Sequence, residues 1–126
     1  MMRPTLTAAL VAAFATGAAA QEIANDQATR SVGQLSLRGL DTLNGTTQDL
    51  EMRVGETIRY GHLEVTAEAC RVPEADPDAD AYAFLRIRDI REDEPRFSGW
   101  MFASSPALSA LDHPRYDIWV LSCSNL

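Results

Sequence analysis

The sequence predicts an all-β protein, a compact antiparallel β-barrel or β-sandwich of six to seven short strands with one short helical turn. Three observations support this class. Apolar and polar residues alternate along several short segments, which is the period of a half-buried strand. Glycine, proline, asparagine and acidic residues separate these segments at short intervals. The chain shows no long helical period and no internal repeat.

The first four expected strands cover residues 34–40, 49–54, 57–60 and 63–70. In the first of them Leu35, Leu37 and, after a glycine, Leu40 alternate with polar residues. The dipeptide Asn44-Gly45 follows, and both of its residues tolerate a positive φ. The first two strands are therefore expected to form a hairpin with one face exposed to water.

Three further strands are expected at residues 82–90, 97–102 and 116–123, after an acidic loop at 72–81. The first has apolar residues at both odd and even positions, so either it is covered on both faces or a bulge shifts its register near Phe84 and Leu85. The last is apolar in the same way and is expected to be central. Between them Ser105 is expected to cap a helical turn that starts at Pro106 and ends before Pro114.

The N-terminus predicts export. Residues 1–20 contain one positive charge, Arg3, then a short apolar run and small residues ending at Ala20. This is the layout of a signal peptide cleaved after Ala20, and it indicates a periplasmic location. Residues 21–33 are expected to be a flexible leader, either a disordered tether or a segment ordered only against a partner, and residues 34–126 a single β domain.

Charge and cysteine content narrow the function classes. The net charge of −7 disfavours nucleic acids and anionic lipids as partners, and no segment after the signal is long and apolar enough to span a membrane. Cys70 and Cys123 are expected to form a disulfide, which would contribute about 4 kcal/mol to stability. Catalytic or metal-binding thiols are the alternative, but they would need a C-x-x-C motif or a histidine cluster that is missing.

The loop before the fifth expected strand is the nearest approach to a metal motif, with alternate carboxylates at Glu74, Asp76, Asp78 and Asp80. Calcium prefers such oxygen ligands. However, Ala81 stands where an EF-hand has glycine, and Ile87 where it has glutamate. The competing interpretation is a solvated loop that keeps the protein soluble.

The residue types of a serine hydrolase also occur, at Ser104, Ser105, His113, Asp112 and Asp117. A G-x-S-x-G motif is lacking, and Ser105 and His113 are already expected at the two ends of the helical turn. We therefore expect no catalytic residues, and hydrolysis is the third of three functional hypotheses.

A contact surface is the first hypothesis. Its expected residues are Trp100, Met101, Phe102, His113 and Tyr116. Aromatic and methionine side chains are enriched at binding surfaces, although they also form cores. Alternation places Trp100 and Phe102 on one face of their strand and Met101 on the other, so one set is expected to be buried and the other available.

Several blocks of the sequence resemble the DUF2155 family of small exported bacterial proteins of unknown function. They are LRGLD (37–41), VGETIRYGHLEV (54–65), Cys70 and SGWMFASSPALSALDHPRYDIWVLSC (98–123). The resemblance covers residues 35–123 and implies an envelope location and a single domain. It implies no activity, cofactor or catalytic residue.

Together these observations predict a periplasmic, non-enzymatic accessory module that docks on an envelope protein or inner-membrane complex, respiratory or cell-wall. The second hypothesis is a module that binds a small ligand or calcium through Asp76, Asp78 and Asp80. Apart from calcium, no cofactor is expected.

Overall fold

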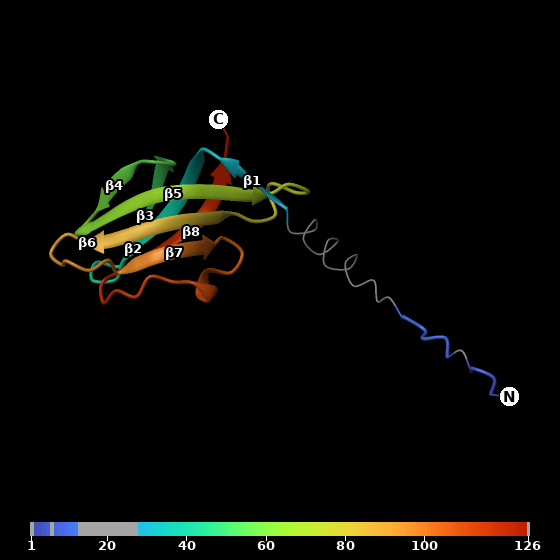
Figure 1. The fold of residues 1–126 in the computed structure, drawn as a ribbon. Coiled ribbons are helices and arrows are strands. Elements are labelled where there is room, and N and C mark those ends of the chain that lie inside the picture. The colour runs from blue at the N-terminus through green and yellow to red at the C-terminus, as the bar shows by residue number, and fades with distance from the viewer. Residues whose placement is uncertain (1, 6, 13–27, 126) are drawn as a thin grey trace.

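Two antiparallel sheets pack face to face in the computed structural model, which describes residues 2–5, 7–12 and 28–125 (Figure 1). The five-stranded sheet contains β1 (Thr29–Val32), β4 (Thr57–Tyr60), β5 (Leu63–Pro73), β6 (Tyr82–Asp89) and β7 (Phe97–Phe102). The three-stranded sheet contains β2 (Gln34–Asp41), β3 (Thr46–Arg53) and β8 (Tyr116–Ser124). This β-sandwich confirms the predicted fold class.

The long strand β5 organises the larger sheet, whose order is β1-β5-β6-β7. Strand β6 pairs with β5 along most of its length, while β4 pairs with residues 63–66 of β5 and β1 with residues 70–73. Strands β1 and β4 therefore share the other edge of β5. In the smaller sheet β2 lies between β3 and β8.

The core lies between the sheets and follows the period-two pattern of each strand. On β2, Leu35 and Leu37 are buried, and β8 contributes Ile118 and Val120. The five-stranded sheet covers them with the inner residues of β5, β6 and β7: Leu63, Val65, Leu85, Ile87 and Met101. Burying such side chains contributes roughly 1.5–3 kcal/mol each, so apolar burial between the sheets drives the fold.

One glycine lets an aromatic ring approach the backbone of the smaller sheet. Gly39 points inward, and a Cβ there would meet the ring of Tyr60 at 2.6 Å. Leu40 consequently lies on the outer face, half-buried, rather than continuing the inner row of leucines. The expected hairpin turn is present after this strand, with Gly45 at a φ of 66°.

The expected disulfide is present. It joins Cys70 on β5 to Cys123 on β8, with the two Cα atoms 5.9 Å apart. The bridge therefore links the two sheets near the C-terminal ends of both strands.

The ordered sheet begins earlier than expected. Residues 29–32, assigned to the flexible leader, form β1 and pair with residues 70–73. That pairing also extends β5 through Val72 and Pro73, which were expected in the acidic loop. Pairing with a distant segment supplies the hydrogen bonds that local sequence does not reveal. The rest of the leader up to residue 27, and the expected cleavage after Ala20, lie outside the described residues.

Three local expectations change in detail. The helix is a single 3₁₀ turn at Pro106–Leu108, and Ser105 makes no side-chain capping bond to it. Strand β8 is an edge of its sheet rather than central. The register shift opposite Phe84 and Leu85 is present, but the extra residue is Glu68 on β5. Within the described part of the chain, no helix has the length and apolar character needed to cross a bilayer.

Candidate functional site

Four aromatic side chains lie together on the outer face of the five-stranded sheet. Strands β6 and β7 pair Tyr82 with Phe102 and Phe84 with Trp100. The rings meet edge to face, with centroids 5.8 Å and 5.4 Å apart. Their sequence neighbours Ala83, Leu85 and Met101 point inward, so strand alternation places all four rings on the outside.

Part of this aromatic surface borders an open groove of about 540 Å³ across the end of the sheet. The lining residues come from β1, β5, β6, β7 and the residue before β1: Ala28, Thr29, Arg71, Pro73, Tyr82, Trp100 and Phe102. We call this the aromatic groove. Its volume lies in the range of ligand sites, roughly 300–1,000 Å³, and Trp100 is 37% exposed beside it.

Among the described residues, Arg71 is the one charged side chain that lines the groove. Its Nε donates to Thr29 Oγ1 at 2.7 Å, its Nη1 to Ser31 Oγ at 2.6 Å and its Nη2 to the Thr29 carbonyl at 2.8 Å. All three acceptors are uncharged oxygens of β1. The guanidinium is therefore held in place without being neutralised by any carboxylate in the described part of the chain.

The structure divides the predicted contact residues into two groups. Trp100 and Phe102 face outward at the groove. Met101 and Tyr116 are only 2% and 3% exposed, and the His113 side chain is 1% exposed. These three cannot form an exposed contact surface, because they pack into the interior. Sequence reasoning also missed Tyr82 and Arg71, whose place in the groove depends on strand pairing.

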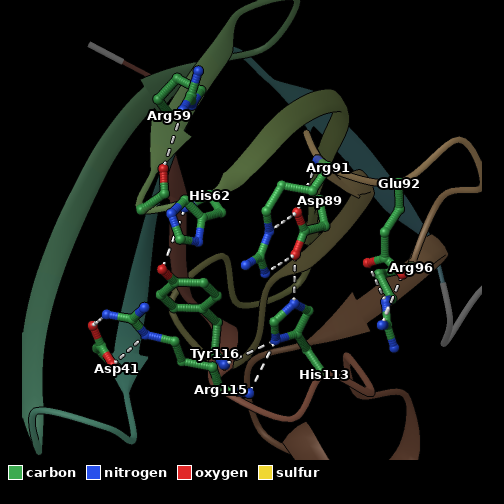
Figure 2. A network of polar contacts seen from close by, with 11 residues as sticks. Asp41, Arg59, His62, Asp89, Arg91, Glu92, Arg96, His113, Arg115 and Tyr116 are labelled. Carbon is green, nitrogen blue, oxygen red and sulfur yellow. Dashed lines mark hydrogen bonds and ion pairs between the residues drawn. The ribbon is translucent and has the colours of Figure 1, made fainter.

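A polar network lies at the other end of β6 from Tyr82 and the aromatic groove. Figure 2 shows this network from close by. Its centre is Asp89 at the end of β6, which is buried. Asp89 Oδ1 accepts from the backbone N–H and the Nε of Arg91, and Oδ2 accepts from Arg91 Nη2 at 2.7 Å. His113 Nε2 lies 3.0 Å from the same Oδ2 atom. We call this group, with Asp41, Arg115 and Tyr116, the polar network.

Both ring nitrogens of His113 are engaged. Its Nδ1 accepts hydrogen bonds from the backbone N–H groups of Arg115 and Tyr116, at 3.0 Å and 3.2 Å. An accepting nitrogen carries no proton, so the proton of the neutral ring is on Nε2 and is donated to Asp89. The hydrogen bonds from Arg91 and then from His113 hold the pKa of Asp89 far below its usual range.

A second ion pair extends the network to the smaller sheet (Figure 2). Arg115 Nε and Nη2 bond to the two carboxylate oxygens of Asp41, at 3.0 Å and 2.9 Å. These bonds lower the pKa of Asp41. Tyr116 connects the sheets further, because its hydroxyl accepts from the backbone N–H of His62 at 3.3 Å. The network thus fastens the loop before β8 to the ends of β2, β5 and β6.

Asp89, Glu92 and His113 are the described residues whose ligating atoms come closest to a metal-binding group, within 4.8 Å of one another. Their hydrogen bonds argue against that use. The Asp89 oxygens and both His113 nitrogens are already engaged, and both Glu92 oxygens accept from Arg96 at 2.8 Å and 2.9 Å. Arginine side chains therefore supply the positive charge that a cation would otherwise supply.

The acidic loop does not gather its carboxylates into such a group among the described residues. Asp76 and Asp78 are exposed, whereas Asp80 accepts from the backbone N–H and the hydroxyl of Ser104. Asp80 therefore fastens the loop to the residues after β7. The residues considered for a serine hydrolase do not form a catalytic triad, since His113 has no free nitrogen with which to act as a base for Ser105 or Ser104.

Comparisons with known proteins identify a family for this chain. The model of a family described as "Uncharacterized protein conserved in bacteria (DUF2155)" matches residues 35–123. An uncharacterized protein of Rickettsia prowazekii (strain Madrid E) is 30% identical over 88 residues, which cover 67% of this chain and 56% of that relative. The chain thus spans little more than half the length of this relative. No solved structure is significantly similar to the chain.

Proposed function

Because the chain belongs to the DUF2155 family, whose description assigns no activity, we propose from the geometry of the aromatic groove that the protein is a non-enzymatic binding module. In this proposal it is exported to the periplasm and docks on another protein or complex of the cell envelope, respiratory or cell-wall. The groove is the contact site, with Trp100 as its central residue.

The observation that carries the proposal is the exposure of the aromatic groove. A small domain gains stability by burying tryptophan, yet Trp100 stays 37% exposed beside Tyr82 and Phe102. Clusters of exposed aromatic side chains are typical of binding surfaces. In contrast, the groups with catalytic chemistry have their hydrogen-bonding positions filled, which favours binding over catalysis.

Two features support the proposed location. The N-terminal sequence has the layout of an export signal, and disulfides such as Cys70–Cys123 form and persist in oxidising compartments. Cell fractionation followed by N-terminal sequencing tests this part. We expect mature protein that begins at Gln21 in the periplasmic fraction. Protein that retains Met1 in the cytoplasm would refute it.

The docking is tested by affinity capture from detergent-solubilised envelopes, with captured proteins identified by mass spectrometry. We expect wild type to retain one defined envelope protein that Trp100→Ala does not retain. Leu108→Ala is the matched control, because Leu108 is an exposed apolar residue of the 3₁₀ turn outside the aromatic groove. Equal capture by wild type and Trp100→Ala would contradict the proposal.

A further inference from the structure

Arg71 differs from most other structured arginines in its partners. Each of the following pairs with a carboxylate: Arg38, Arg86, Arg88, Arg91, Arg96 and Arg115. Arg71 instead bonds to Thr29 and Ser31, which are neutral. Within the described ranges, its positive charge is uncompensated although the chain as a whole carries a net charge of −7.

The guanidinium retains unused donors. It has five N–H groups, and the bonds to β1 use one on Nε, one on Nη1 and one on Nη2. One N–H on each Nη atom is left. A partner that covered the groove without an acceptor would strip water from these donors and from the charge, at a substantial cost in binding free energy.

The rest of the lining is mainly apolar, with Tyr82, Trp100, Phe102 and Pro73 beside Arg71. Such a groove accepts an apolar or aromatic side chain, because ring edges and faces pack against it with little need for polar partners. The arginine next to it favours a carboxylate, which can take two N–H donors at once. One ligand must therefore combine an apolar group and a carboxylate.

We propose that the aromatic groove binds an extended acidic peptide segment of the partner protein. An apolar or aromatic side chain of that segment packs against Tyr82, Trp100 and Phe102, and the carboxylate of a neighbouring aspartate or glutamate binds Arg71. This inference rests on the proposed function and adds the chemistry of the partner. The uncompensated positive charge of Arg71 favours an acidic segment over a neutral or basic one.

A peptide fits the lining better than a glycan. Saccharides need several hydrogen-bonding groups for their hydroxyls, whereas the described lining offers polar side-chain groups only on Arg71, Thr29, Tyr82 and the indole N–H of Trp100. Thr29 Oγ1 is already engaged with Arg71. A side chain with an adjacent carboxylate needs only the charged group and the rings.

The test starts from a random library of ten-residue peptides with blocked ends, selected against the folded protein. We expect enrichment of sequences that place aspartate or glutamate within two positions of an aromatic or large aliphatic residue. The most enriched peptide is then synthesised together with a version in which asparagine or glutamine replaces the acid. The amide version is expected to bind at least ten-fold more weakly, because it lacks the charge-assisted bonds.

Variants of the protein locate this effect. Arg71→Gln is expected to lower affinity for the acidic peptide at least ten-fold and to abolish its preference over the amide version. Arg59→Gln is the matched control, since Arg59 is exposed on β4 outside the groove, and it is expected to bind as wild type does. Because Arg71 also holds β1, circular dichroism and Tm must show that Arg71→Gln is folded. Arg71→Lys keeps the charge and is expected to retain part of the acidic preference.

Binding is followed by the fluorescence anisotropy of a dye-labelled peptide, because this signal does not depend on Trp100 and can be measured for every variant. Selected peptides without an acidic preference, or equal binding by folded Arg71→Gln, would overturn the inference. If Trp100→Ala then still abolished binding, the proposed function would stand. Binding that is indifferent to both Arg71→Gln and Trp100→Ala would overturn both. Arg71-dependent binding of soluble glycan chains freed of their stem peptides, with no peptide selected, would replace the peptide by a glycan and so refute the inference.

Discussion

The two ends of the sandwich are fastened in different ways, and the difference explains which end keeps aromatic and charged side chains exposed. At one end the Cys70–Cys123 disulfide joins the sheets, and Cys123 Sγ lies 3.9 Å from the carbonyl oxygen of Tyr82 beneath the aromatic groove. At the other end the polar network joins them through hydrogen bonds of Asp89 and His113 (Figure 2).

A covalent bond fastens one end without using any surface side chain, so the rings and Arg71 above it remain open. The polar network needs its own functional groups for fastening. Every nitrogen and oxygen at its centre, on Asp89 and His113, is used internally. Asp89 and His113 are therefore structural, whereas Trp100 at the other end stays partly exposed.

The largest expected effect concerns the disulfide end. Replacing both Cys70 and Cys123 by alanine should lower the free energy of unfolding by about 4 kcal/mol, because the unfolded chain gains the entropy of an open loop across a sequence separation of 53. Urea unfolding measures this change. Reduced wild type is the control and should match the double variant. A loss below about 1 kcal/mol would show that the other contacts between the sheets fasten this end without the bridge.

A loss of about 3 kcal/mol is expected for His113→Ala, because the backbone N–H groups of Arg115 and Tyr116 lose their acceptor and Asp89 loses a donor. Asp112→Ala, at the exposed neighbouring position, should change stability little. Chemical denaturation of both variants provides the comparison. Unchanged stability in His113→Ala would mean that the network is not what fastens this end.

Acid should weaken the polar network. The pKa values of Asp89 and Asp41 are lowered in the folded state. These two groups therefore add stability at pH values above their unfolded pKa of about 3.9. This stability is lost as the pH falls below that value. The slope of the unfolding free energy against pH, measured between pH 3 and pH 5, gives the number of protons taken up on unfolding. Near pH 3, Asp89→Asn should take up about one proton fewer than wild type. Asp93→Asn, at an exposed position in the same turn, is the control. Equal pH slopes for Asp89→Asn and wild type would contradict the pairing.

The smallest effect on stability is expected at the groove. Trp100→Ala should cost only about 1 kcal/mol, since the ring is partly exposed and loses mainly its edge-to-face contact with Phe84. The same substitution should abolish partner binding. Thermal unfolding and the capture experiment are compared on one preparation. A large loss of Tm would place Trp100 among the core residues and remove the contrast between the two ends.

Most of the fold prediction rested on patterns among residues that are close in sequence. The alternation of residues 63–67 in β5 and the turn at Gly45 depend on neighbouring residues, and both were predicted, as was the disulfide. Strand β1 was missed because its four residues have no apolar alternation, and only pairing with β5 makes them a strand. The capping bond expected for Ser105 is likewise absent, because the turn is too short to need it.

The candidate site was predictable only in part. Alternation alone separated Trp100 and Phe102 from Met101, as the structure confirms. It could not show that Tyr116 and His113 are buried, because Gly61, the His62 backbone N–H and Asp89 reach them from elsewhere in the chain. Arg71 looked like any other arginine until β1 supplied its three neutral acceptors.

The amino-acid order by itself thus determined the class of fold, the strand periods, the turns and the single possible cysteine pairing, since all of these depend on local pattern or on counting. Only the tertiary structure decided which polar groups satisfy one another and which stay open. That outcome depends on which distant strands become neighbours, because hydrogen bonds and ion pairs reach only a few ångströms.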